Sequence, residues 1–408
     1  MKIIVVGGGA AGMMAAYHAA NIGNQVLLLE KNEKLGKKIY ITGKGRCNVT
    51  NAADMETLFG NINRNAKFCY SALYGFDNNA VYSFMEENGC SLKIERGDRV
   101  FPVSDHASDV IKALSNALKK EKVEVMLNTT VKSLFIEENT VKGVLLSNQK
   151  KLLADKVILA TGGISYPTTG STGDGLRFAE WAGHSIEELR PSLVPIVTKE
   201  SYIPKLQGLS LKNVELSLYV ENKVLFKEMG EMLFTHFGIS GPLVLSMSSV
   251  FTDLCKKGQK CQIKLDLKPA LTNEQLDKRI LRDFEAAQNK QYKNSLDALL
   301  PQKLIPVIVE LSKIDPYKPV NVISKEERNR LCSIVKCMPI TPVKCAPIEE
   351  AIITRGGVNV KEINSSTMES KLAKNLYFAG EMIDVDCMTG GFNLQFAWST
   401  GYLAGACE

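Results

Sequence analysis

A short β-branched segment followed by a glycine-rich turn near the N-terminus constrains the fold most strongly. Residues 3–6, Ile-Ile-Val-Val, have the composition of a buried parallel strand. Residues 7–12 then have the spacing Gly-x-Gly-x-x-Gly, residues 13–22 predict a helix, and residues 25–29 predict a second strand. This order of strand, turn, helix and strand predicts an α/β fold with a Rossmann-like sheet.

The residue types in this turn suit a dinucleotide. Gly7 permits the tight turn, Gly9 lets the backbone approach a pyrophosphate, and Gly12 lets the helix pack against the strand. Glu30 ends the second strand, where its carboxylate can accept both hydroxyls of an adenosine ribose. Ala11 and Lys31 complete this first set of candidate cofactor contacts. The alternative is a glycine-rich turn that binds no ligand.

Further glycine-rich segments favour a long cofactor such as FAD over NAD. Residues 43–51 form a second loop of this kind, for which the alternative is a solvent loop. Two predicted strands end in Thr-Gly-Gly and in Gly-Glu, and a glycine pair opens the last helix, at residues 396–406. The candidate contacts in these segments are Gly45, Arg46, Cys47, Asn48, Thr161, Gly162, Gly380, Glu381, Asp384, Gly391, Phe392, Asn393 and Leu394. We therefore expect a discontinuous FAD-binding domain built from both chain ends.

Composition excludes several classes of protein. The 408 residues are 45% apolar and 23% charged, which is ordinary for a soluble globular protein. The net charge is +6, and the sequence contains no block of five consecutive Lys or Arg, so we expect no nucleic-acid partner. The sequence contains no stretch of 18 apolar residues, so we expect no membrane span. Ten scattered Cys and four His predict no metal site, and they favour a reducing, cytoplasmic location.

The middle of the chain has a different pattern. Residues 191–267 contain alternating segments that predict a β-rich insert. Helices are expected after a cap at Thr272 and after a capping box formed by Ser324 and Glu327. We expect an FAD-binding domain at 1–190 and 351–408, a β-rich insert domain at 191–270 and 336–350, and a helical subdomain at 271–335.

Several segments resemble the BaiN-like and aminoacetone-oxidase family of bacterial FAD proteins. These segments are 43–51, 165–175, 233–242, 354–359 and 380–393, and they span nearly the whole chain. Thr172-Gly173-Asp174-Gly175 also resembles the fumarate-reductase and aspartate-oxidase flavoproteins. The resemblance implies that Asp174 and Glu381 contact a non-covalent FAD and that the backbone of Val131 holds adenine. Because a second Gly-x-Gly-x-x-Gly unit is absent, any NAD(P)H would dock transiently as electron donor.

The resemblance implies an FAD-dependent oxidoreductase that acts on a small-molecule substrate. Reduction of a conjugated carbon–carbon double bond in a 3-oxo, bile-acid-like molecule is the leading expectation. Oxidation of a small amine such as aminoacetone by oxygen, and a non-catalytic FAD-binding sensor, remain alternatives. His236 on a glycine-rich loop, Tyr166 and Arg355 are the candidate catalytic or substrate-contacting residues. We expect the insert to cover the flavin; the oligomeric state stays open.

Overall fold

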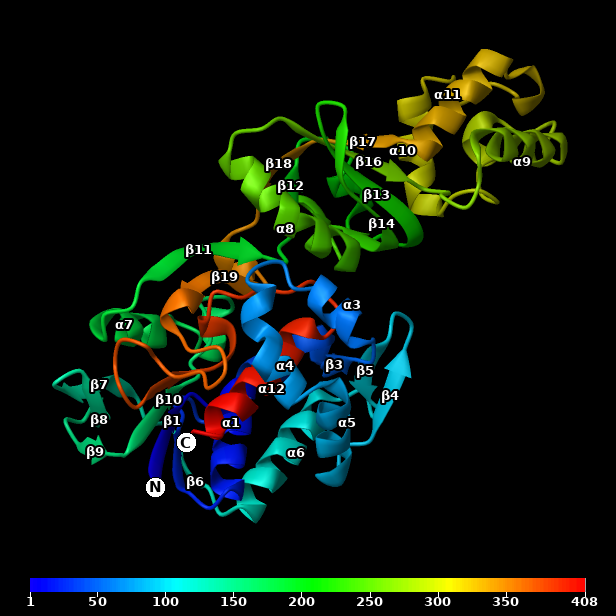
Figure 1. The fold of residues 1–408 in the computed structure, drawn as a ribbon. Coiled ribbons are helices and arrows are strands. Elements are labelled where there is room, and N and C mark those ends of the chain that lie inside the picture. The colour runs from blue at the N-terminus through cyan, green and yellow to red at the C-terminus, as the bar shows by residue number, and fades with distance from the viewer. Residues whose placement is uncertain (408) are drawn as a thin grey trace. The chain divides into compact units, whose positions relative to one another are not determined.

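The computed structural model describes residues 1–407, which divide into two compact units. The first unit comprises Met1–Ser192 and Ile348–Glu408, and the second comprises Leu193–Pro347. Each unit has its own hydrophobic core. Figure 1 labels the helices and strands of both units. The finer division of the second unit into a β-rich and a helical domain stays a prediction.

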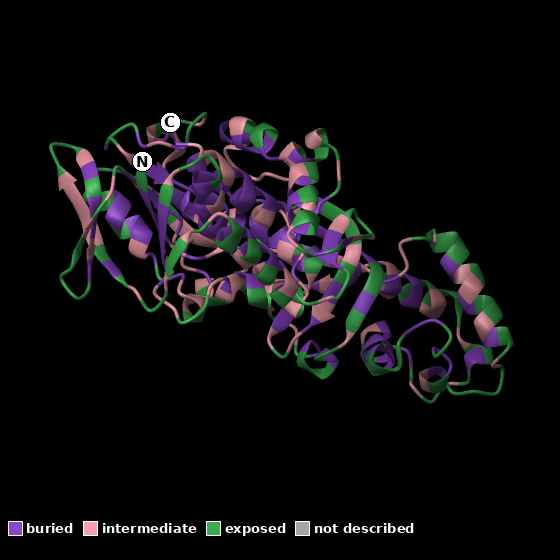
Figure 2. Ribbon diagram, turned by 90° about the horizontal axis from the view of Figure 1, so that it is seen from below, coloured by how far each residue is buried: buried purple, intermediate pink, exposed green. Residues whose placement is uncertain are grey.

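A five-stranded parallel sheet forms the centre of the first unit. Its order is β20-β10-β1-β2-β6, and every neighbouring pair is parallel. The strands are β1 (Lys2–Val6), β2 (Gln25–Leu29), β6 (Glu124–Met126), β10 (Lys156–Leu159) and β20 (Leu376–Phe378). β1, β2, β10 and β20 are buried along most of their length (Figure 2). Their β-branched and leucine-rich sequences suit this position, because parallel strands are covered on both faces.

Helix α1 (Ala10–Asn21) packs closely against helix α12 (Phe392–Gly405) from the other end of the chain. Two glycines of α12 make this approach feasible. A Cβ atom on Gly401 would lie 2.3 Å from the carbonyl oxygen of Ala11, and one on Gly405 would lie 2.6 Å from that of Ala15. The last helix of the chain therefore packs directly on the first helix of the same unit.

Smaller elements surround the central sheet of the first unit. Residues 131–153 form an antiparallel three-stranded sheet, β3, β4 and β5 form another, and β11 pairs with β19. The remaining helices and strands of the first unit are α2 (Lys37–Ile41), β3 (Thr50–Asn51), α3 (Met55–Gly60), α4 (Tyr70–Gly75), α5 (Asn78–Glu87), β4 (Leu92–Glu95), β5 (Arg99–Pro102), α6 (Ala107–Lys120), β7 (Val131–Glu137), β8 (Thr140–Leu146), β9 (Lys151–Leu153), α7 (Asp174–Trp181), β11 (Ile186–Ser192) and β19 (Ile353–Val358).

The second unit contains a seven-stranded antiparallel sheet in the order β17-β16-β13-β14-β15-β12-β18. The predicted caps of α9 and α11 are confirmed, since Thr272 with Gln275 and Ser324 with Glu327 form complete capping boxes. The bounds are β12 (Ile196–Thr198), β13 (Ser210–Val220), β14 (Lys223–Phe234), β15 (Gly238–Ser240), α8 (Pro242–Lys256), β16 (Cys261–Asp266), α9 (Asn273–Glu285), α10 (Ile305–Ser312), α11 (Lys325–Lys336), β17 (Met338–Ile340) and β18 (Pro342–Cys345).

Helix α8 departs from the expected alternation of strands in residues 191–267. Pro242 occupies the first helical turn, where its missing N–H costs nothing, and an apolar segment follows it. Leu243, Val244, Met247 and Phe251 recur at helical spacing and are buried. None of the helices in residues 1–407 is long and apolar enough to cross a membrane.

Replacing Gly401 with Ala should destabilise the first unit. The added methyl would be 2.3 Å from the Ala11 carbonyl oxygen, so α1 and α12 must separate, at a cost of about 1–3 kcal/mol. Gly75→Ala in α4 is the matched control, because no atom lies within 4 Å of the added methyl there. Urea unfolding of both variants and the wild type measures the difference, and equal midpoints would contradict this packing.

Candidate functional site

Four of the predicted cofactor residues meet at one edge of the parallel sheet. Gly7 follows β1, Glu30 follows β2, Thr161 lies just beyond β10, and Gly380 lies just beyond β20. Parallel neighbours place the carboxyl ends of these strands together, and ligands of open α/β sheets bind there. Four segments that are far apart in sequence therefore contribute to one site.

The glycine turn after β1 has the geometry that the spacing predicts. Gly7 has φ +108°, and a Cβ atom on Gly12 would lie only 1.8 Å from the Gly7 carbonyl oxygen. Both positions thus need glycine for the turn itself. A Cβ atom on Gly9, in contrast, would meet no atom within 4 Å, and its φ of −85° suits any residue. The protein itself does not require glycine at position 9, so the open space there is available to a ligand.

Glu30 has a role within the protein that its spacing did not reveal. One carboxylate oxygen accepts from the Gly8 backbone N–H at 2.7 Å. The other accepts from the backbone N–H of Asn32 at 2.8 Å and from its side-chain amide at 2.7 Å. The buried carboxylate therefore fixes the glycine turn while it keeps lone-pair capacity for a further donor.

An open pocket of about 390 Å³ lies at the end of β1 and β2. It brings together six of the predicted cofactor residues, which come from five segments of the chain. Its lining residues are Val6, Gly7, Leu29, Glu30, Lys31, Thr129, Thr130, Val131, Thr161, Gly170, Asp174 and Phe178. The Thr161 hydroxyl oxygen is buried without a hydrogen-bond partner, which leaves a polar group for a bound molecule.

Lys31 and Asp174 form an ion pair on the wall of this pocket. The Lys31 Nζ atom lies 2.6 Å from a carboxylate oxygen of Asp174 and 2.5 Å from the Thr172 hydroxyl. Burial alone would raise the pKa of Asp174, but the hydrogen bond and charge of Lys31 outweigh it and hold that pKa below its usual value. Asp174 is thus an anion, and it orients the Lys31 ammonium beside the pocket.

Glu381 connects four segments around the end of β20. Its carboxylate lies 2.6 Å from Lys38 Nζ and accepts from the Ser165 hydroxyl and the Thr354 backbone N–H, both at 2.8 Å. Sequence reasoning missed Lys38, because it stands in a lysine-rich stretch that looks solvated. Gly162 and Gly163 pass beside this carboxylate, since Cβ atoms there would lie 4.0 and 3.0 Å from its oxygens.

The loop over residues 43–51 is joined to the start of α12. Asn51 donates to the Gly390 carbonyl at 3.0 Å, and Trp398 donates to the Val49 carbonyl at 2.9 Å. Gly391 has φ +102°, and a Cβ atom there would lie 2.4 Å from the Thr50 carbonyl oxygen. Gly391, Phe392 and Leu394 lie at the helix N-terminus, which no side chain caps, so its N–H groups favour a polar or anionic ligand.

Within this loop, the predicted residues differ in what they offer a ligand. Gly45 has φ +86° with open space around it, and the Asn48 side-chain oxygen is buried without a partner. Arg46, however, pairs with Glu95 and Asp105 and stacks on the Phe101 ring at 4.2 Å. Burial raises the pKa of the Cys47 thiol to about 12, so this thiol is not a nucleophile. Position 46 therefore offers a ligand its backbone only.

Asp384 and Asn393 are likewise occupied by protein groups. Asp384 lies 3.1 Å from the Arg64 guanidinium and accepts from the Asn65 amide at 3.0 Å. Burial raises the pKa of Asp384. The Asn393 side chain accepts from the Cys387 N–H and donates to the carbonyls of Cys387 and Met388. These two side chains hold the segment before α12 in place, and their predicted contact with FAD stays a prediction.

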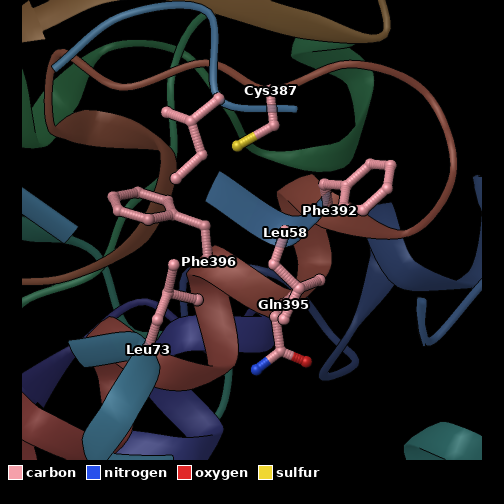
Figure 3. A pocket seen from close by; sticks show the side chains of 7 residues that line it. Leu58, Leu73, Cys387, Phe392, Gln395 and Phe396 are labelled. Carbon is pink, nitrogen blue, oxygen red and sulfur yellow. The ribbon is translucent and has the colours of Figure 1, made fainter. Parts of the chain in front are cut away.

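A second, apolar pocket lies beside the start of α12 (Figure 3). Its space is about 210 Å³, and the lining residues are Leu58, Ile62, Leu73, Cys387, Phe392, Gln395 and Phe396. Burial raises the pKa of the Cys387 thiol, and the Gln395 amide is already bound to the Phe76 carbonyl and the Ser399 hydroxyl. This pocket contains no group suited to a phosphate.

The three candidate catalytic residues lie in both units. Tyr166 is in the first unit at φ +51°, and burial raises the pKa of its phenol. Arg355 is also in the first unit, on β19, with its Nε atom 3.9 Å from Asp386. His236 is exposed in the turn between β14 and β15 of the second unit, with its ring edge-on to Phe237 at 4.9 Å. Their roles stay predictions.

The residues present fit an adenine dinucleotide. The open space at Gly9, the unpartnered hydroxyl of Thr161 and the pocket between Glu30 and Val131 lie at the sheet edge where such a molecule binds. Throughout residues 1–407, no group of three or more His, Cys, Asp or Glu side chains is placed to hold a metal ion.

Two curated proteins resemble the chain along nearly its whole length. One is the 3-dehydro-bile acid delta(4,6)-reductase of Clostridium scindens, which is 32% identical over 99% of this chain and 98% of its own. The other is the ribosomal RNA dihydrouridine synthase of Escherichia coli, which is 31% identical over 98% of this chain and 96% of its own.

A solved structure supports the fold independently of close sequence similarity. The 3-ketosteroid delta1-dehydrogenase of Sterolibacterium denitrificans matches with a TM-score of 0.54 and 16% identity, over 99% of this chain and 98% of its own. The model of the HI0933-like protein Rossmann domain matches residues 1–407. This chain therefore belongs to the HI0933-like family of Rossmann-type FAD-binding flavoprotein oxidoreductases.

Proposed function

We propose that this FAD-dependent oxidoreductase reduces a carbon–carbon double bond conjugated to a carbonyl group. The chemistry shared by its two full-length relatives carries the proposal. A delta(4,6)-reductase of a 3-dehydro-bile acid saturates bonds conjugated to a ketone. A dihydrouridine synthase saturates the bond beside a uracil carbonyl. The substrates differ greatly in size and charge, so the activated double bond is what the two reactions have in common.

The site residues would bind and orient the cofactor for this reaction. Gly7, Gly9 and the N-terminus of α1 would hold the pyrophosphate, Glu30 the adenosine ribose, and Val131 the adenine edge. The segment from Gly391 to Leu394 would lie against the flavin ring. Bound FAD supplies hydride transfer, which the protein directs through orientation and the polar groups around the ring.

Electrons would come from a donor that binds transiently. The strand, turn and helix at residues 2–21 form the one Gly-x-Gly-x-x-Gly unit of the sequence, and FAD would occupy it. We therefore propose that NAD(P)H docks near the flavin, transfers a hydride and leaves. A proton donor must then complete the addition across the double bond, and His236 and Tyr166 carry groups that can do so.

The FAD-loaded enzyme, reduced under anaerobic conditions, should be reoxidised by a 3-oxo-4,6-diene steroid acid or by a uridine-containing RNA. Return of the visible flavin band measures the reaction, and mass spectrometry of the product should show two added hydrogen atoms per double bond. Aminoacetone is the comparison substrate, and it is added to the oxidised enzyme, because an amine oxidase would take electrons from it, lose the visible flavin band and regain that band with oxygen. Turnover of aminoacetone alone would favour an amine oxidase. A flavin that neither aminoacetone reduces nor the dienone or RNA reoxidises would favour a sensor.

Gly9→Val should abolish FAD retention without unfolding the protein. The valine side chain would enter the open space beside the α1 N-terminus, and the extended backbone at position 9 tolerates it. Gly12→Val is the contrasting variant, because it must disrupt the turn itself. Flavin absorbance per chain and apoprotein thermal unfolding should separate the two. A Gly9→Val protein that keeps wild-type FAD content would contradict this site.

His236→Ala should lower kcat/KM on the accepted substrate by about 10²-fold while FAD content and spectrum stay unchanged, if its imidazole donates the proton. Tyr166→Phe is the parallel variant, since it removes only a hydroxyl. Rapid-reaction measurement of flavin reoxidation compares both with the wild type. Full activity in the His236 variant would leave this residue as part of a turn, and loss of FAD would assign it to the cofactor site.

A further inference from the structure

The ten cysteines are scattered in the sequence, but the fold gathers three of them around one strand of the second unit. All ten lie within residues 1–407, and each is a free thiol. Six of them are buried, and the four that are partly exposed are Cys255, Cys261, Cys337 and Cys345. We call Cys255, Cys261 and Cys345 the thiol cluster, because all three lie on or beside β18.

Cys255 and Cys345 lie on two elements that pack against each other. Cys255 is in the last turn of α8, and Cys345 ends β18, on which α8 packs. The Cys255 sulfur lies 4.0 Å from the carbonyl oxygen of Val343. The Cys345 sulfur lies 3.3 Å from the hydroxyl oxygen of Thr252, which precedes Cys255 by one helical turn. Both sulfurs therefore lie in the interface between α8 and β18.

Cys261 is a neighbour of this interface. It is the first residue of β16, a strand that also contacts β18. In the antiparallel pairing of β16 with β17, Ile263 faces Ile340, and continuing this register brings Cys261 level with Pro342. Its thiol donates to the Gln259 carbonyl at 3.5 Å, within its own turn. Cys261 thus offers a nearby thiol that is bound locally, against which a pairing of Cys255 with Cys345 can be tested.

The two thiols of the interface differ in reactivity. Burial raises the pKa of the Cys345 thiol to about 11, although the hydrogen bond with Thr252 opposes this change, and charge on Cys255 raises it further. Cys345 is therefore a neutral thiol near pH 7, and such a thiol is a slow first nucleophile. Cys255 is the residue expected to react first with a reagent from solution.

The turn that follows Cys255 is exposed and basic. Residues 256–260 are all exposed, and they include Lys257 and Lys260. Positive charge beside a thiol raises the local concentration of anionic reagents. A low-mass disulfide that contains carboxylates, as oxidised glutathione does, is such a reagent.

We propose that Cys255 and Cys345 form a reversible disulfide by exchange with an anionic low-mass disulfide of the glutathione type. The Cys255 thiolate attacks one sulfur of that molecule, its S–S bond breaks, and one low-mass thiol leaves. The Cys345 thiolate then attacks the Cys255 sulfur of the mixed disulfide, and the second low-mass thiol leaves. Two protein thiols are oxidised, one disulfide is reduced to two thiols, and the two protons pass to the leaving thiolates.

The bond would join α8 to the last strand before the chain returns to the first unit. Reversible disulfides of this kind serve redox sensing in proteins from reducing compartments. The proposal is independent of the proposed reaction, because it uses no residue of the cofactor site.

Incubation of the full-length, FAD-loaded protein with oxidised glutathione tests the proposal. The thiols titrated in the denatured protein should fall from ten to eight, because two of them enter the disulfide. Trypsin cleaves after Lys256, Lys260 and Lys344, so each thiol of the cluster lies in a peptide of its own. Mass spectrometry should find the peptides of Cys255 and Cys345 joined, and dithiothreitol should restore all ten thiols.

A wild type that keeps ten thiols, or that joins Cys255 to Cys261, would overturn the proposal. This peptide map uses the wild type alone, so it decides the question even where a variant does not fold.

Serine variants separate the roles of the three thiols. Cys345→Ser should stop at the mixed disulfide and gain one glutathionyl group at Cys255, and Cys255→Ser should form no cross-link. Cys261→Ser is the matched control, because it removes the neighbouring thiol and should form the cross-link as the wild type does. Loss of the cross-link in Cys261→Ser, or its survival in Cys255→Ser, would contradict the assignment. Circular dichroism establishes that each variant is folded.

Reversal of the two lysines tests the anionic class of the reagent. Lys257→Glu with Lys260→Glu should lower, by about threefold or more at low salt, the ratio of the rate with oxidised glutathione to the rate with neutral 2-hydroxyethyl disulfide. Lys142→Glu with Lys150→Glu, two exposed lysines of the first unit, changes the net charge equally and should leave this ratio unchanged. An equal ratio in all three proteins would refute attraction of an anion to this turn.

Discussion

The close approach of α1 to the end of β1 is the contact on which the cofactor site depends. Gly12 leaves no room for a Cβ atom beside the Gly7 carbonyl, and this contact directs the α1 N-terminus toward the sheet edge. The same helix then packs on α12 through Gly401 and Gly405. One steric requirement in the first turn thus fixes two helices and orients the N–H groups that an anionic cofactor needs.

Three carboxylates around the site are preorganised by the protein's own donors. Glu30 holds the glycine turn, Asp174 holds Lys31, and Glu381 holds Lys38, Ser165 and Thr354. A buried or partly buried carboxylate without such partners would be costly, and these hydrogen bonds and ion pairs offset that cost. Because each joins segments distant in sequence, the carboxylates also tie the sheet edge to the loops that surround it.

The sequence allowed the first unit to be predicted well, because its elements are local. Strand, glycine turn, helix and terminal acid follow one another within 30 residues, and each has its own pattern of spacing. What depends on distant contacts could not be predicted. Lys38 in the lysine-rich stretch and Arg46 in the glycine-rich loop look alike as basic residues, yet one joins Glu381 and the other joins Glu95 and Asp105.

The second unit shows the same limit for two further features. Helix α8 was missed because its apolar residues follow segments that alternate like strands. Most of the helix is buried, so its sequence has no exposed polar face to indicate a helical period. The uneven division of charge was also missed. Residues 193–347 contain 23 Lys and Arg against 16 Asp and Glu, but the total of +6 averages over a division of the chain that becomes visible only once the two units are known.

The parallel sheet takes one strand, β20, from the last 33 residues of the chain, and α12 follows it. During synthesis, the first βαβ segment therefore leaves the ribosome long before its partners exist. The second unit, whose strands pair among themselves, can fold while the first still waits. During that interval the edge of β10 that later pairs with β20 and the face of α1 that contains Ala11 and Ala15 stay uncovered. The unfinished chain therefore exposes a strand edge and an apolar helix face that the finished fold conceals, which are the features that favour aggregation of incomplete chains.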